Sequence, residues 1–304
     1  MALSSLDSPV LEGEPATKRD LVDYLDAVAD RLVPVLAGRP LSVIRVRPGQ
    51  EPFMQKNLPK YTPDWVASVV IRSQTGREVR YALCDDRRTL LWLANQRAVE
   101  YHPGLFTVDD DGATQLVLDL DPPEGAGFAE VVAVARLVHA TLDAAGLTGA
   151  VKTSGAKGVH IVVPLAPTGF EDAAAATRAL AARAAALDPT IATTAFVKEE
   201  REGKVFVDST RAGGATVVAA YSPRIRPGLP VSFPLEWAEL ESVSPGDFTI
   251  ATAPGLLTDR PSWTELLPAP QTLPEDVVAE GHTIPIARVQ AMHEGKRRKR
   301  AAGS

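Results

Sequence analysis

The stretch QLVLDLD, residues 115–121, decides the fold because it predicts a buried β-strand that ends in two carboxylates. Side chains alternate between the two faces of a strand, so the leucines share one face and Val117, Asp119 and Asp121 share the other. The two carboxylates then lie about 6–7 Å apart at Cα and repel each other unless a cation or a proton lies between them. The segment predicts an apolar face and an acidic end that suits a divalent metal, although D-x-D is also typical of turns and helix caps.

The segments on either side alternate between strand and helix patterns, which predicts an α/β or mixed α+β core. Further strands are expected at residues 41–46, 65–72, 159–165 and 204–208, with a short one at Val151. Helices are expected at residues 17–37, with Thr17 as the N-cap, and at 89–100, 127–145 and 171–187. Residues 223–274 are rich in proline and predict an irregular strap rather than a separate domain.

Composition bounds the class of protein. A chain of 304 residues that is 45% apolar can bury the core of one large domain or of two lobes. A single cysteine, Cys84, excludes an intramolecular disulfide framework.

The net charge of −6 argues against indiscriminate coating of nucleic acid but leaves room for a local basic groove. No segment approaches the ~20 apolar residues of a membrane span, so we expect a cytoplasmic protein without membrane contact.

A third acid ends another predicted strand. In KVFVD, residues 204–208, Phe206 and Asp208 share one face, so Asp208 is the candidate for a third metal ligand. Hard cations such as magnesium and manganese prefer carboxylate oxygens. A pair of such ions about 3.5–4 Å apart can activate an attacking hydroxyl and stabilise a leaving phosphate oxygen.

A glycine-containing turn falls between the acidic strands in sequence order. It reads KTSGAKGVH, residues 152–160, and offers the Ser154 hydroxyl, the Lys157 charge and backbone N–H groups near Gly155 and Gly158. This combination suits a triphosphate, although the turn is not a Walker A loop. His160 is predicted to face the same pocket. The alternatives are a plain hairpin-like turn and a core histidine.

The motifs together resemble a known family. LVLDLDP (116–122), KTSGAKGVHIVVPL (152–165), KVFVDSTR (204–211) and AAYSPRIRPGLPVS (219–232) occur in this order and spacing. The chain resembles the polymerase domain of bacterial ligase D and its stand-alone relatives in the archaeo-eukaryotic primase superfamily, from about residue 17 to about residue 274. The resemblance implies a primase-polymerase fold, in which an RRM-like catalytic sheet packs against a second mixed α/β lobe with the active site between them. We expect residues 1–290 to form this unit and residues 291–304, with the run KRRKR, to be a basic disordered tail.

The resemblance implies three groups of functional residues. The first holds two divalent ions, Mn²⁺ or Mg²⁺, and comprises Asp119, Asp121 and Asp208. The second binds the nucleoside triphosphate and comprises Ser154, Lys157, His160, Arg224 and His102. The third contacts DNA and comprises Lys18, at the 5′-phosphate of a gap or break, with Phe53 and Lys56 in the loop EPFMQKN.

The chain departs from the family pattern at several positions. A second lysine, expected some ten residues before Lys18, is replaced by Ser8 and Pro9, which weakens the expected recognition of a 5′-phosphate. Met54 stands where the family often has a second aromatic residue. Ser-Thr-Arg after Asp208 replaces the more usual aromatic-Ser-Gln-Asn, and a lysine is missing around residue 215. These changes bear on nucleotide choice, and none removes a predicted metal ligand.

The resulting functional hypothesis is a DNA-dependent nucleotidyltransferase that adds ribo- or deoxyribonucleotides to a primer 3′ end in DNA repair. The resemblance implies short gap filling and double-strand break end joining, two-metal catalysis with a preference for manganese, and a liking for ribonucleotides. The expected partners are gapped or broken DNA with a 5′-phosphate, NTP or dNTP, and a separate DNA ligase and end-binding protein. Two alternatives are a non-catalytic DNA end- or gap-binding module that retains the fold and a metal-dependent nucleotide phosphohydrolase.

Overall fold

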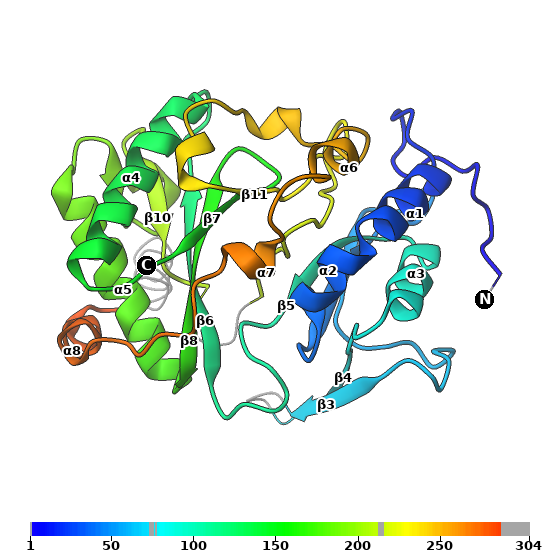
Figure 1. Ribbon diagram of the computed structural model, residues 1–304, viewed down its shortest axis with the longest axis horizontal. Helices are drawn as coiled ribbons and strands as arrows, with labels where there is room; N and C mark the ends of the chain where they lie inside the picture. Colours follow the sequence, from blue (N-terminus) through cyan, green and yellow to red (C-terminus); the bar gives the residue numbers. More distant parts are fainter. Residues whose placement is uncertain (1, 73–75, 77, 212–215, 287–304) are drawn as a thin grey trace, which may run out of the picture.

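The structure, a computed structural model, describes residues 2–72, 76, 78–211 and 216–286. It contains a six-stranded and a five-stranded sheet, each with its own helices beside it (Figure 1). Within the described ranges, no helix combines the length and hydrophobicity that crossing a lipid bilayer requires. The predicted tail, residues 291–304, lies outside the described residues.

The six-stranded sheet contains an RRM-like unit. In chain order, the elements of this unit are β6 (Ala113–Asp121), α4 (Phe128–Ala144), β7 (Ala150–Thr153), β8 (Val159–Thr168), α5 (Phe170–Leu187) and β10 (Val205–Asp208). The strands lie in the order β7-β8-β6-β10, each antiparallel to its neighbour. This is the β-α-β-β-α-β topology of ferredoxin-like folds, so the RRM-like sheet expected from the sequence is confirmed. Two short strands extend its edges, β9 (Ala192–Thr193) and β11 (Pro234–Leu235).

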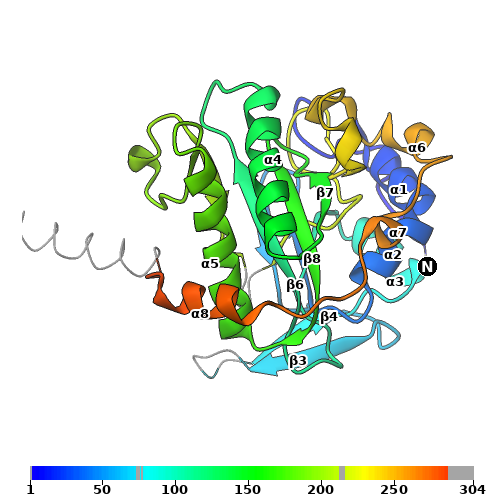
Figure 2. The same ribbon diagram turned by 60° about the vertical axis from the view of Figure 1, so that its left-hand side comes forward.

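The central strand β6 has the two faces that its sequence predicts. Leu116 and Leu118 are fully buried and stand opposite Val163 and Ile161 of β8. Helices α4 and α5 both contact β6, and Figure 2 shows them in front of β6 and β8. Burial of this apolar face against two helices is the main packing interaction of the unit. It leaves the opposite face of the sheet, which carries Asp119, free for other groups.

The other sheet and its helices form the second lobe. Its strands are β1 (Leu41–Arg45), β2 (Phe53–Gln55), β3 (Ser68–Arg72), β4 (Glu78–Ala82) and β5 (Ala98–Pro103). They run in the order β2-β1-β4-β3, with β5 paired to the other edge of β1. Beside them lie α1 (Lys18–Ala27), α2 (Ala29–Leu36) and α3 (Arg87–Asn95), as Figure 1 shows. The second mixed lobe expected from the resemblance is therefore present.

The predicted boundaries of two helices were wrong. The helix predicted at residues 17–37 is two helices separated at Val28, whose backbone is not helical; Thr17 caps the first of them, as expected. The helix predicted at 89–100 ends at Asn95 because Arg97 adopts a left-handed backbone conformation, with φ of 63°. The residues after it pair with β1 as strand β5, so sheet hydrogen bonding decided their conformation.

The proline-rich segment is irregular, as expected. Between residues 223 and 274 it forms the two-residue strand β11 and short helices, among them α6 (Ala253–Leu256) and α7 (Trp263–Leu266). The helix that follows, α8 (Glu275–Thr283), was not predicted from the sequence. It packs on α5, where Arg183 Nε donates to Glu280 at 2.8 Å.

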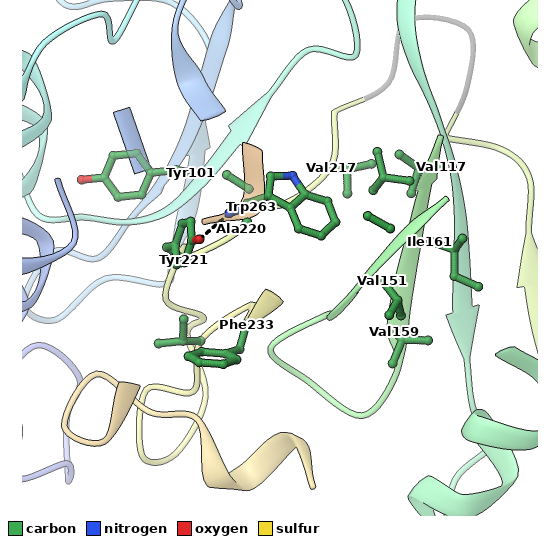
Figure 3. Packing of buried hydrophobic residues seen from close by; sticks show 14 of the residues in the cluster. Tyr101, Val117, Val151, Val159, Ile161, Val217, Ala220, Tyr221, Phe233 and Trp263 are labelled. Atoms are coloured by element: carbon green, nitrogen blue, oxygen red, sulfur yellow. Dashed lines mark hydrogen bonds between the residues drawn. The ribbon is translucent and has the colours of Figure 1, made fainter. Parts of the chain in front are cut away.

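Tyr221 joins the irregular segment to α1 of the second lobe. Its hydroxyl accepts a hydrogen bond from the Trp263 backbone N–H at 2.7 Å, drawn in Figure 3, and its carbonyl accepts one from the Tyr24 hydroxyl at 2.7 Å. The Tyr221 side chain is fully buried. One residue thus ties α1 of one lobe to α7 at the other end of the segment.

We expect Tyr221→Phe to lower the free energy of unfolding by about 1–3 kcal/mol, because the buried Trp263 N–H loses its acceptor. Urea unfolding measures the change. Tyr61→Phe is the matched control, because Tyr61 is 58% exposed and water can replace its hydroxyl contacts. A loss no larger than that of the control would contradict the role given to Tyr221.

Candidate active site

Four polar side chains form a row across the face of the six-stranded sheet opposite α4 and α5. Asp208 of β10 stands directly opposite Asp119 of β6, and Asp119 stands opposite His160 of β8. His160 in turn stands opposite Lys152 of β7. Directly paired residues of antiparallel strands project from the same face, with Cα atoms about 4.5–5.5 Å apart. The register alone therefore brings these four side chains, the polar row, side by side.

His160 connects the two ends of the row. Its Nδ1 lies 2.8 Å from the Lys152 Nζ, and its Nε2 lies 3.3 Å from Asp119 Oδ1. Lys152 also donates to the Val218 carbonyl and to the Ser232 hydroxyl. The sequence analysis did not assign a role to Lys152, although it begins the same turn motif. Strand register across the hairpin was the signal that could have identified it.

Burial and neighbouring charge determine the protonation of the row. Burial raises the pKa of Asp119, but His160, Arg211 and Lys152 outweigh it and lower the pKa to about 2. Burial and the nearby Lys152 charge lower the pKa of His160 to about 4. Burial also lowers the pKa of Lys152 well below its ordinary value, followed by the charge of Arg224. At neutral pH Asp119 is a carboxylate held beside a neutral imidazole.

Asp121 lies at the outer end of β6 and is the most exposed of the three acids. Burial and then the Asp119 charge raise its pKa, and Arg201 opposes this shift. Arg201 Nη1 lies 3.9 Å from Asp121 Oδ2, while its guanidinium stacks 3.8 Å from the centre of the Phe206 ring. The sequence analysis did not single out Arg201.

Asp119, Asp121 and Asp208 carry the donor oxygens that a divalent ion would need. Across the part of the chain that the structure describes, no three His, Cys, Asp or Glu side chains converge closely enough to form a metal cage. Asp119 and Asp208 nevertheless face one cationic group, because Arg211 lies 3.4 Å from an oxygen of each. Their carboxylates are the donors that Mg²⁺ and Mn²⁺ prefer. The acids therefore suit such an ion in their donor chemistry, whereas among the described residues their placement does not form a three-ligand site.

The glycines of the predicted phosphate turn serve packing as well as turn geometry. A Cβ on Gly158 would lie 1.9 Å from the Leu120 carbonyl oxygen, and Gly155 has φ of +68°. The Gly158 N–H donates to the Ser154 hydroxyl oxygen, so it is not offered to an anion as the sequence analysis expected. Ser154 is buried and Lys157 is exposed. Hydrogen bonds within the turn and its packing against Leu120 therefore determine the conformation of the turn.

Arg224 and His102 meet at Glu100, which the sequence analysis missed. Glu100 Oε2 lies 2.8 Å from His102 Nε2 and 3.1 Å from Arg224 Nε. Arg224 also donates to the Ser154 carbonyl at 2.6 Å. Because Glu100 and His102 belong to β5 and Ser154 to the turn after β7, this cluster bridges the two sheets. Of the residues predicted to bind the nucleotide, the structure thereby connects His102, Arg224 and Ser154, and it leaves Lys157 and His160 outside this cluster.

The predicted DNA-contacting residues lie on the other lobe. Phe53, on the edge strand β2, is half-buried beneath the Arg47 guanidinium, 4.9 Å from the ring centre, and Lys56 and Met54 are exposed. Lys18, by contrast, is only 3% exposed. Its ammonium donates to the Ser4 carbonyl and to Asn95 Oδ1, at 2.6 and 2.8 Å. Lys18 therefore anchors the N-terminal segment in this structure.

Comparisons with known proteins identify the family. Residues 17–263 match the family model described as LigD, primase-polymerase domain. The chain is 35% identical over 258 residues to the bifunctional non-homologous end joining protein LigD of Bacillus subtilis, covering 83% of this chain and 41% of that protein. It is 34% identical over 254 residues to the multifunctional non-homologous end joining DNA repair protein LigD of Mycobacterium tuberculosis, covering 79% and 33%.

A solved structure agrees with this match. The polymerase domain of Mycobacterium tuberculosis ligase D, in complex with DNA, superimposes with a TM-score of 0.82 at 31% identity, over 88% of this chain and 97% of that one. The fold and the site define a two-lobed protein whose RRM-like sheet carries the polar row. The chain belongs to the LigD primase-polymerase domain family. It spans about two fifths or less of the length of these curated relatives.

We expect Glu100→Gln to destabilise the protein in a pH-dependent way. Burial raises the pKa of Glu100, but His102, Arg224 and the Ile225 N–H outweigh it and lower the pKa from 4.5 to about 2. The ionised carboxylate therefore stabilises the fold above pH 4.5, and this contribution is lost as the pH falls towards 2. The difference in unfolding free energy between wild type and Glu100→Gln should shrink by roughly 2 kcal/mol between pH 7 and pH 3.

Urea unfolding at the two pH values measures this difference. Glu51→Gln, at an exposed position, is the control and should show little change with pH. A difference for Glu100→Gln that stays constant between pH 7 and pH 3 would show that the carboxylate charge does not hold the cluster.

Proposed function

We propose that this chain is a DNA-dependent nucleotidyltransferase of the primase-polymerase type that extends primer 3′ ends during DNA repair. The polar row carries the proposal, because it sets Asp119 and Asp208 opposite each other with His160 and Lys152 behind them. Family membership supports it, since the relatives named above are non-homologous end joining proteins. In the proposed reaction the primer 3′-hydroxyl attacks the α-phosphate of a nucleoside triphosphate, and pyrophosphate leaves.

The proposed cofactor is a pair of divalent ions, Mn²⁺ or Mg²⁺. Asp119, Asp121 and Asp208 would hold one ion, and Asp119 and Asp121 the other. Such a pair, when bound, lowers the pKa of the attacking hydroxyl and neutralises charge on the phosphates. The Asp119 carboxylate is prepared for this task because His160 and Lys152 fix its position and keep it ionised.

The proposed nucleotide site lies between the two lobes. Lys157 is exposed and can reach the triphosphate, and the Ser154 hydroxyl, whose oxygen accepts from the Ala156 and Gly158 N–H groups, would donate its proton to a phosphate oxygen. Arg224 supplies charge beside the same turn. We propose that His102, which contacts Glu100, lies near the incoming nucleotide. Both ribo- and deoxyribonucleotides are candidate substrates.

The proposed DNA surface includes Phe53 and Lys56 on and beside β2. An aromatic ring at this place can stack on a base, and a lysine can contact a phosphate. The exposed Arg47, whose guanidinium lies over the Phe53 ring, adds positive charge to this surface, whereas Arg45, 5.7 Å from the same ring centre, is buried. The proposed substrates are gapped or broken DNA ends, and the proposed partners are a DNA ligase and an end-binding protein.

Primer extension with Mn²⁺ tests the proposal. We expect the wild type to extend a primer, and Asp119→Asn and Asp208→Asn each to lower the rate by about 100-fold or more, as is typical when an electrostatic stabiliser of the transition state is removed. Asp143→Asn is the matched control, because Asp143 is an exposed acid on α4, behind the sheet. It should extend primers at the wild-type rate.

The same assay separates the alternatives. Absence of extension by the wild type, with DNA binding unchanged in both aspartate variants, would favour a non-catalytic end-binding module. Conversion of triphosphates without template or primer would favour a phosphohydrolase. Extension at the wild-type rate by both aspartate variants would show that the site assignment is wrong.

We expect the 5′-phosphate of a gap to stimulate extension about fivefold or less, the worth of one exposed ion pair. Lys18 already donates to Ser4 and Asn95, and Ser8 and Pro9 replace the second lysine of the family pattern. Extension on gapped DNA with and without the phosphate, offering each nucleotide type separately, measures this. A stimulation of about 50-fold that Lys18→Ala abolishes would restore Lys18 as a dominant phosphate ligand.

A further inference from the structure

Arg211 lies between two of the proposed metal ligands. It follows β10 by three residues, and its Nε lies 3.4 Å from Asp208 Oδ2 while its Nη2 lies 3.4 Å from Asp119 Oδ2. The two nitrogens of one guanidinium thus reach the carboxylates of two neighbouring strands. The sequence analysis noted Arg211 only as part of a departure from the family pattern, and no role follows from that departure alone.

The three side chains differ in how firmly they are held. The side chains of Asp208 and Asp119 are 9% and 15% exposed and belong to paired strands. The Arg211 side chain is 44% exposed and lies beyond the end of the strand. The carboxylates are therefore fixed in place, whereas the guanidinium can leave them at little cost.

We propose that Arg211 is a tethered counter-cation that occupies the carboxylates of Asp119 and Asp208 until a divalent ion displaces it, and that it then binds the phosphates of the incoming nucleotide. The inference rests on the proposed function, since it uses the same acids and the same substrate. It adds a substrate-binding residue that the family pattern does not predict for this chain.

Two physical arguments lead to this proposal. A divalent ion and a guanidinium cannot occupy the same carboxylate oxygens, so Arg211 must lower the apparent affinity for the ion by competition. A guanidinium displaced from Asp119 and Asp208 stays within a side-chain length of the site. Guanidinium groups bind phosphate oxygens through paired, charge-assisted hydrogen bonds. Arg211 therefore opposes binding of the ion alone and favours binding of the ion together with a nucleotide.

A titration with Mn²⁺ tests whether Arg211 competes with the divalent ion. The purified protein is titrated, and free Mn²⁺ is measured by its electron paramagnetic resonance signal. Without nucleotide, we expect Arg211→Gln to bind Mn²⁺ about 3- to 10-fold more tightly than the wild type, the scale set by two partly exposed ion pairs. Arg72→Gln is the control, because it removes one exposed arginine from the other sheet and changes net charge equally. Its Mn²⁺ affinity should equal that of the wild type.

The second half is tested with a non-hydrolysable nucleoside triphosphate at saturating Mn²⁺. In this titration the substitution should weaken binding: we expect Arg211→Gln to bind the nucleotide about 3- to 10-fold more weakly than the wild type. Arg211→Lys retains the charge and should lie closer to the wild type in both titrations. This variant also keeps the test open if the glutamine variant does not fold.

The outcomes distinguish this inference from the proposed function. Equal or weaker Mn²⁺ binding by Arg211→Gln would overturn the inference even if the wild type extends primers. Stronger Mn²⁺ binding without weaker nucleotide binding would overturn the phosphate-binding half. Absence of Mn²⁺ binding by the wild type would remove the basis of the proposed function and of this inference together.

Discussion

The antiparallel register of β7, β8, β6 and β10 is the constraint on which the site depends. Asp208, Asp119, His160 and Lys152 are far apart in the chain, and only direct cross-strand pairing sets them in one row. A shift of one residue in any pair would turn the side chains of one strand to the opposite face, beneath α4 and α5. The leucines of β6 oppose such a shift, because it would expose them and bury carboxylates under the helices. Hydrophobic burial on one face thereby holds the polar row on the other.

The row also shows how buried charge is tolerated. An unpaired carboxylate at the place of Asp119 would be strongly destabilising, but His160 contacts one of its oxygens and Arg211 the other. The Lys152 ammonium has three hydrogen-bond partners: His160 Nδ1, the Val218 carbonyl and the Ser232 hydroxyl. An imidazole and a guanidinium thus contact the two oxygens of the Asp119 carboxylate. The same arrangement orients the carboxylate, which a site that must hold an ion in a defined position requires.

The two lobes are joined by polar contacts at the site as well as by the apolar core. Glu100 on β5 holds His102 and Arg224, and Arg224 reaches the turn that contains Ser154. Tyr221, three residues before Arg224, ties α7 of the irregular segment to α1 of the second lobe. The irregular segment thus contacts α1 of the second lobe through Tyr221 and the turn after β7 through Arg224. Through Arg224 it brings His102 of one lobe near Ser154 of the other, two of the residues predicted to bind the nucleotide.

Sequence by itself determined the long, strongly patterned elements and the acids at their ends. The alternation in residues 115–121 identified β6 and its acidic face, and the order of the motifs indicated the RRM-like sheet and the family. Only the tertiary structure decided which strands are neighbours and in what register, and hence the roles of Lys152, Glu100 and Arg211. Local pattern also misassigned residues 98–100, where pairing with β1 outweighed helical periodicity. The reason is that periodicity is a property of neighbouring residues, whereas register and charge pairing arise between residues that only the folded chain brings together.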